Sequence, residues 1–68
     1  MSNKVYKKIE IVGTSTISIS DAVSNAVSKA SETVRNLDWF EVTDTRGYIQ
    51  DGKPVFQVEV KVGFRIDD

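Results

Sequence analysis

The chain has 68 residues, of which 40% are hydrophobic and 28% are charged, and its formal net charge is -1. This composition is typical of a folded chain with one domain, residues 1–68, and it excludes a disordered protein. A net charge so close to zero gives no attraction to nucleic acid or to an anionic membrane, so neither is expected as a partner.

The sequence contains neither cysteine nor histidine. The chain therefore lacks the commonest general base, the thiolate nucleophile and two common metal ligands, so neither a metal site nor an enzyme is expected. No apolar run is long enough to cross a bilayer and no signal-peptide pattern is present, so the cytoplasm is the expected compartment. Domains below ~70–80 residues rarely gain more than ~3–5 kcal/mol from one core, so assembly into an oligomer is expected.

Residues 4–12 are predicted to form the first strand, because apolar and polar side chains alternate there. On this alternation Tyr6 lies on the face away from the apolar residues. The following Gly-Thr-Ser-Thr segment, residues 13–16, is predicted to be a turn that ends the strand.

A helix is predicted between Ser18 and Asn36. Ser18 is a suitable N-cap, and Asp21 three residues later resembles a capping box. Asn36 is a suitable C-terminal residue. The apolar positions repeat at steps of three and four and consist of Val23, Ala26, Val27, Ala30, Val34 and Leu37. Because this stripe is rich in small and β-branched residues, the helix can lie close to a sheet.

Two further strands are predicted over residues 39–49 and 56–66. Asp51-Gly52 between them indicates a tight hairpin, because a type I′ turn requires positive φ at both central residues. The third strand alternates most regularly, with Gln57 and Arg65 on its polar face.

The second strand has a defect in its alternation. Strict alternation from Val42 would bury Asp44 and Arg46, and an unpaired buried charge is costly. Either the strand extends beyond the helix, or a bulge near Thr43–Thr45 reverses the phase. We favour the bulge, which would turn Arg46 to the same side as Trp39.

The order strand–helix–strand–strand predicts an α+β fold of type β-α-β-β. The helical crossover makes the first two strands parallel, and the simplest arrangement places the third strand between them, antiparallel to both. One helix covers only one face of such a sheet. The other face and both edges stay uncovered, which again favours assembly.

Trp39, the only tryptophan, is predicted on the face away from Phe40 and Val42. Its indole can stack on a planar conjugated ring, although a tryptophan that packs at a subunit interface fits the pattern as well. Gln57 can offer a donor and an acceptor to the edge of a heterocycle, or it can simply be solvated. Arg46 and Arg65 can pair with phosphate or can be ordinary surface charges.

The sequence resembles the dodecins, which are small flavin-binding proteins. The resemblance covers nearly the whole chain and is carried by an ordered set of segments: residues 5–7 (Val-Tyr-Lys), 9–15 (Ile-Glu-Ile-Val-Gly-Thr-Ser), 35–42 (Arg-Asn-Leu-Asp-Trp-Phe-Glu-Val), 46–47 (Arg-Gly), 57–58 (Gln-Val) and 61–65 (Lys-Val-Gly-Phe-Arg). It implies a three-stranded antiparallel sheet partly wrapped around one helix, and a hollow homo-dodecamer. Thr16-Ile17 and Tyr48 depart from the Ser-Pro and the His that are common in the family.

The resemblance also implies a binding site. Dodecins hold flavins in pairs between subunits, so Trp39 becomes the expected stacking platform and Gln57 the residue that binds the ring edge. Leu37 and Asp38, which precede Trp39, belong to the same expected site. Arg46 and Arg65 become candidates for the flavin tail or phosphate. FMN or riboflavin is the expected ligand. Coenzyme A is a second expected ligand on the outer surface, with Lys4 and Tyr6 as candidate contacts.

These inferences predict a flavin storage and buffering protein without turnover, in which Trp39 quenches the excited flavin. The alternative is a structural homo-oligomer in which Trp39 only joins subunits. A flavoenzyme would need a residue placed for turnover, and the sequence offers none.

Overall fold

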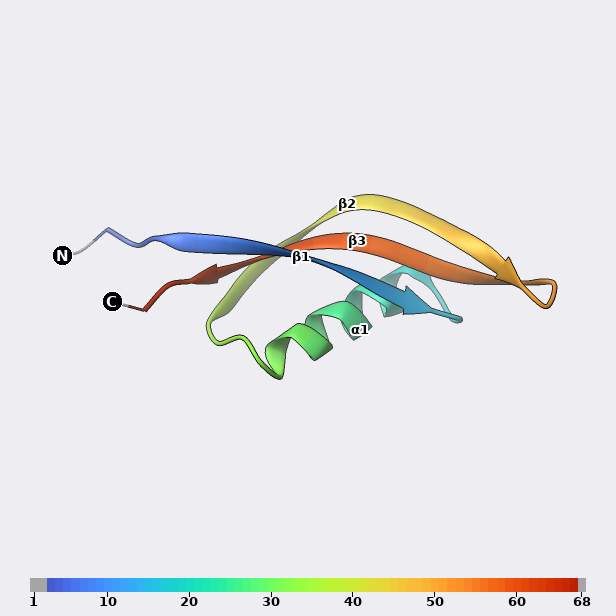
Figure 1. Ribbon diagram of the computed structural model, residues 1–68, viewed down its shortest axis with the longest axis horizontal. Helices are drawn as coiled ribbons and strands as arrows, with labels where there is room; N and C mark the ends of the chain where they lie inside the picture. Colours follow the sequence, from blue (N-terminus) through green and yellow to red (C-terminus); the bar gives the residue numbers. More distant parts are fainter. Residues whose placement is uncertain (1–2, 68) are drawn as a thin grey trace.

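The computed structural model describes residues 3–67. Its elements are β1 (Tyr6–Ser15), α1 (Ile19–Ser31), β2 (Leu37–Gln50) and β3 (Lys53–Arg65), as Figure 1 shows. β3 lies between β1 and β2 and is antiparallel to both. The predicted α+β fold, with its three-stranded antiparallel sheet and single helix, is therefore confirmed. Among residues 3–67 no helix is long and apolar enough to cross a membrane.

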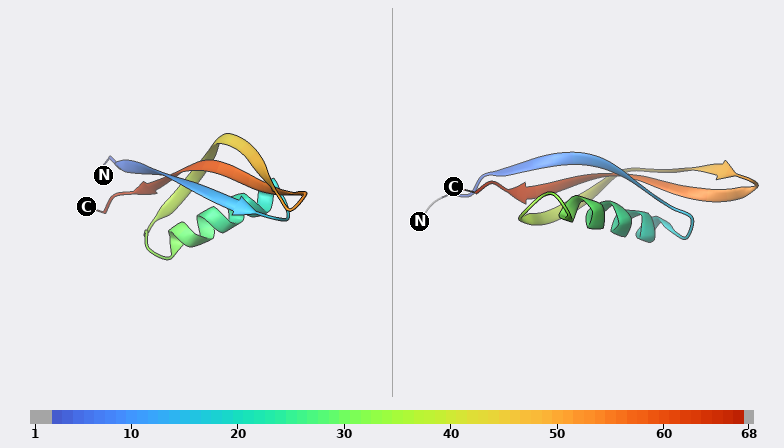
Figure 2. Two further views of the ribbon diagram at one scale, coloured as in Figure 1. Left: turned by 45° about the vertical axis from the view of Figure 1, so that its right-hand side comes forward. Right: turned by 60° about the horizontal axis from the view of Figure 1, so that its bottom comes forward.

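The helix covers one face of the sheet, and the β2–β3 hairpin extends well beyond it (Figure 2). Asp51 and Gly52 have φ values of 53° and 75°, which confirms the predicted tight turn at the tip of the hairpin. Near this tip Ile49 is 78% exposed because no helix lies beneath it.

β1 continues through the segment that was predicted to be a turn. Gly13 pairs with Val58 and Ser15 pairs with Phe56, so the turn prediction was wrong for residues 13–15, and the strand ends only before Thr16. Gly13 is buried where α1 crosses the strand, and a Cβ there would lie 2.8 Å from the Cβ of Ala26. Glycine is therefore needed for the close approach of helix and strand, and not for a turn.

The start of α1 agrees with the sequence. The Ser18 hydroxyl caps the helix by accepting a hydrogen bond from the Asp21 amide at 3.0 Å. The Asp21 carboxylate in turn accepts a hydrogen bond from the buried Ser15 hydroxyl at 2.6 Å. These bonds fix the end of β1 to the first turn of the helix.

The end of α1 was predicted too late in the chain. The helix ends at Ser31, and Asn36 lies in the connection to β2 with a φ of 65°. The Asn36 amide donates to the Asp67 carboxylate at 2.7 Å, and Arg35 also pairs with this carboxylate. The hydrogen bond from Asn36, and to a smaller extent that from Arg35, lowers the pKa of Asp67. Asn36 therefore ties the connection to the end of β3.

The core is formed where small helical residues meet the valines of the central strand. The buried residues of α1 are Ala22, Ala26 and Ala30, and those of β3 include Val58, Val60 and Val62, each at most 1% exposed. Ile9, Ile11, Ile19, Val23 and Leu37 pack around them. Val27 is only half-buried and Ala22 was not predicted, so the buried stripe is rotated toward the alanines.

Candidate functional site

The face of the sheet away from α1 carries polar and aromatic side chains, and we call it the open face. Cross-strand partners share a face, so the register defines its members. They include Tyr6, Lys8 and Glu10 on β1, Gln57, Glu59, Lys61, Gly63 and Arg65 on β3, and Trp39, Glu41, Asp44, Arg46 and Tyr48 on β2. Trp39, Gln57, Arg46, Arg65 and Tyr6 were all predicted as site residues, and the fold brings them to this one face.

A bulge in β2 places Trp39 and Arg46 on the same face. The predicted bulge is confirmed, since the register shifts between Val42 and Asp44. The Thr43 hydroxyl at this bulge donates to the backbone carbonyl of Glu59 at 3.3 Å. A second shift, which was not predicted, lies between Leu37 and Trp39. Trp39 and Arg46 are seven positions apart, and residues an odd number of positions apart point to opposite faces of a regular strand. The bulge between Val42 and Asp44 is therefore needed to bring both side chains to one face.

Trp39 is held against the backbone of the central strand. It pairs with Gly63, and a Cβ on Gly63 would overlap atoms of the indole ring. The ring of Tyr6 meets the indole edge-on, with centroids 5.2 Å apart and planes at 66°. Trp39 nevertheless remains 40% exposed. The indole is thus fixed by the sheet and by Tyr6, and it still offers surface to a ligand.

Gly63 is a site residue that the sequence analysis did not identify. Its signal was a glycine inside a strand, at a position where the alternation predicts a long polar side chain, because a glycine within a strand often marks a close approach by another group.

Gly63→Ala is expected to displace the indole, because the added methyl group would occupy the space of the Trp39 ring. The intrinsic fluorescence of Trp39 should shift, and flavin affinity should fall by about tenfold as part of a stacking energy of ~1–3 kcal/mol is lost. Lys61→Ala on the same face of β3 is the control. An unchanged tryptophan spectrum in Gly63→Ala would show that the ring does not rest on Gly63.

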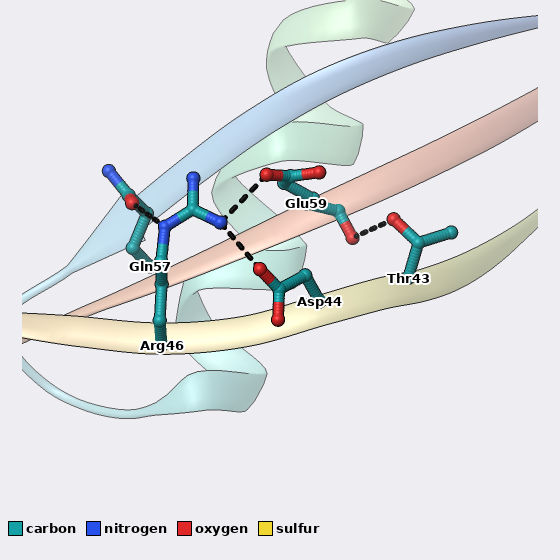
Figure 3. A network of polar contacts seen from close by, with 5 residues as sticks. All are labelled: Thr43, Asp44, Arg46, Gln57 and Glu59. Atoms are coloured by element: carbon teal, nitrogen blue, oxygen red, sulfur yellow. Dashed lines mark hydrogen bonds and ion pairs between the residues drawn. The ribbon is translucent and has the colours of Figure 1, made fainter.

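Arg46 lies in a polar network with three partners, as Figure 3 shows. Its Nη1 lies 2.7 Å from the carboxylates of both Asp44 and Glu59. Its Nε donates to the Oε1 of Gln57 at 2.5 Å. Hydrogen bonds to Glu59 and then to Asp44 raise the pKa of Arg46. Two carboxylates therefore compensate the charge of this arginine.

The remaining predicted residues lie around this face or behind it. Leu37 packs against the core on the helix side of the sheet, so it supports the strand beside Trp39 from behind. Asp38 is exposed at the unpredicted register shift. Lys4 is exposed just before β1. Tyr6, which was predicted to contact a separate ligand on the outer surface, is in contact with Trp39.

The open face is long compared with a flavin ring. Gln57 lies six positions before Gly63 on β3, and Trp39 pairs with Gly63. At ~3.3 Å per residue, this separation is roughly 20 Å of strand. One isoalloxazine ring cannot stack on Trp39 and reach Gln57 of the same protomer.

Other charged groups on the open face do not form a metal site. Lys8 on β1 pairs with Glu41 on β2 at 3.2 Å. Within residues 3–67, no three or more His, Cys, Asp or Glu side chains gather closely enough to hold a metal ion.

Comparison with known proteins identifies the family. The Dodecin family model matches residues 5–67. The chain is 47% identical over 66 residues to the dodecin of Thermus thermophilus, with 96% of each chain covered. It is 52% identical to the solved dodecin of Streptomyces coelicolor, with a TM-score of 0.92 and coverage of 100% of this chain and 99% of that one. A calcium dodecin from Mycobacterium tuberculosis, with a novel calcium-binding site, is 30% identical with a TM-score of 0.83, and the match covers 93% of this chain and 91% of that one. The chain therefore belongs to the dodecin family.

Proposed function

We propose that this protein stores and buffers flavin, holding FMN or riboflavin between the subunits of a hollow homo-dodecamer. The observation that carries the proposal is the exposed indole of Trp39, fixed against Gly63 and Tyr6 on a face that no helix covers. An aromatic surface that is rigid before binding is suited to a flat ring, because little side-chain entropy is lost on stacking.

Assembly is part of the proposal. The separation of Trp39 and Gln57 along the open face favours a ring that stacks on Trp39 of one subunit while Gln57 of another binds its edge. Both sheet edges and the open face are uncovered in the protomer, which supports the same arrangement.

The ligand tail is proposed to lie near Arg65, since the charge of Arg46 is already compensated. Arg65 is exposed at the end of β3 opposite Tyr6. Coenzyme A is retained as a proposed second ligand, with Lys4 and Tyr6 as its contacts. The proposed role is binding without turnover, in which the nearby indole quenches the excited flavin and limits its photochemistry.

The test combines light scattering with a flavin titration. At low micromolar concentration the protein should have the mass of a dodecamer, and added riboflavin or FMN should lose its fluorescence as it binds. A stable folded monomer would contradict the assembly. A dodecamer that leaves flavin fluorescence unchanged would contradict the storage role and leave a structural oligomer in which Trp39 joins subunits.

A further inference from the structure

We propose that Arg46 is a positioning residue that sets the side-chain amide of Gln57 for hydrogen bonding to the edge of a flat heterocycle, and that it does not bind the ligand phosphate. This inference rests on the proposed flavin-binding function. It identifies the Arg46 guanidinium as the group that orients Gln57, the residue expected to bind the ring edge. It assigns Arg46 a different role from the one that the sequence alone suggested.

The contact between the two side chains fixes which way the amide faces. Arginine has N–H donors but no acceptor, so the amide atom that faces its Nε must be the oxygen. The distance from Arg46 Nε to Gln57 Oε1 is 2.5 Å. Figure 3 shows the amide nitrogen of Gln57 on the side away from the guanidinium. The Gln57 amide therefore has one defined orientation.

The guanidinium that holds Gln57 is itself anchored by two carboxylates at its Nη1. Asp44 on the same strand and Glu59 on the neighbouring strand each lie 2.7 Å from its Nη1. The bulge at Thr43 brings Asp44 and Arg46 onto this face beside Glu59. A side chain with several charge-assisted bonds loses little further freedom when a ligand arrives.

The same anchors make Arg46 a poor partner for phosphate. Two carboxylates share the Nη1 of a single cation, so the cluster of Asp44, Arg46 and Glu59 is negative in net charge. A phosphate at the guanidinium would be repelled by both carboxylates or would have to displace them. Recognition of the ligand tail must then come from cations elsewhere on the protein.

The amide that Arg46 positions has a defined hydrogen-bonding pattern. Oε1 keeps one lone pair free after accepting from Arg46, and the NH2 group keeps its donors. This pattern complements an N–H group beside a carbonyl group. The oxidised isoalloxazine has a single ring N–H, at N3, and it lies between two carbonyls. We therefore assign this edge of the flavin to Gln57, and the preferred ligand class is a flat heterocycle with an imide edge.

The experiment compares riboflavin, FMN and N3-methylriboflavin as ligands of the assembled protein by fluorescence titration. The methylated analogue lacks the N3 hydrogen and so cannot donate to Gln57. The first variant is Arg46→Lys, which keeps the positive charge but cannot donate from the Nε position. Gln57→Ala removes the amide itself. The control is Lys8→Ala, which removes an ion-paired cation from the same face without touching Gln57.

The parent and Lys8→Ala should prefer riboflavin to the methylated analogue by about tenfold or more, because a site built for a hydrogen bond rejects a ligand that lacks it. Arg46→Lys and Gln57→Ala should lose most of this preference, with riboflavin affinity about 3- to 10-fold weaker. Full retention of the preference in Arg46→Lys would overturn the positioning role.

A charge-balanced double variant, Arg46→Gln with Glu59→Gln, tests the phosphate role separately. It removes one cation and one carboxylate, so its ratio of FMN to riboflavin affinity should match the parent ratio. A selective loss of FMN affinity in this variant would show that Arg46 binds phosphate and would overturn the inference. If the parent protein binds no flavin at all, the proposed function fails, and this result is distinct from either outcome in the variants. Light scattering on each variant confirms that the dodecamer is present before titration.

Discussion

Trp39→Ala is expected to lower flavin affinity by at least ~10-fold while the subunit keeps its fold. The indole contacts Gly63 and Tyr6 on the open face, whereas the core valines Val58, Val60 and Val62 lie on the opposite face of the sheet. Stacking on an aromatic side chain is worth ~1–3 kcal/mol per ring, and each ~1.4 kcal/mol is a factor of ten in affinity. Any flavin that still binds should regain fluorescence, because its nearest electron donor is gone.

The measurement is a flavin titration by fluorescence on protein that light scattering shows to be assembled. Trp39→Phe is the matched control, since it keeps an aromatic ring on Gly63 and should lose less affinity. Assembled Trp39→Ala protein that binds and quenches flavin like the parent would refute the role of Trp39 as a stacking platform. Trp39 would then be only an interface residue of a structural oligomer.

Ala26→Asp is expected to abolish folding and assembly together. Ala26 is 5% exposed and packs where α1 crosses Gly13, so the variant would bury a carboxylate without a partner. An uncompensated buried charge costs about 3–5 kcal/mol, and a domain of this size has little more than that from its core. The expected result is insoluble protein, or a soluble chain whose circular dichroism lacks the native spectrum.

Ser28→Asp is the control for this prediction, because it adds the same charge to an exposed position of the same helix. It should unfold at nearly the parent temperature. The stability of Val27→Asp should lie between those of Ala26→Asp and Ser28→Asp, since Val27 is only half-buried. A stable, assembled Ala26→Asp protein would mean that the alanines of α1 do not face the sheet.

The parts of the fold that the sequence predicted depend on local chemistry. Ser18 and Asp21 mark the helix start, and Asp51-Gly52 requires the tight turn through its backbone conformation. The strand order follows from the connection lengths and the handedness of the crossover. The bulge near Thr43 was predictable because the alternative buried a charge.

The parts that were missed depend on contacts between distant segments. Gly13 was assigned to a turn because glycine is common there, and only the approach of α1 shows that it belongs to a strand. The contact of Tyr6 with Trp39 joins residues far apart in the sequence. In the same way, the role of Gly63 as the surface beneath Trp39 is visible only from the position of the indole over it. Single-residue patterns carry no information about such partners.

The two register shifts in β2 have a consequence for how the chain tolerates changes in length. They lie between Leu37 and Trp39 and between Val42 and Asp44, with Thr43 at the second. Side chains alternate between the two faces of this strand, so the face of each later side chain depends on whether the number of residues before it is odd or even. It does not depend on the identity of the residue itself. Deleting one residue at Thr43 would turn Arg46 and Tyr48 toward the helix side, although no residue of the site had been altered. Length at these two points is therefore as strictly specified as the residue types of the site.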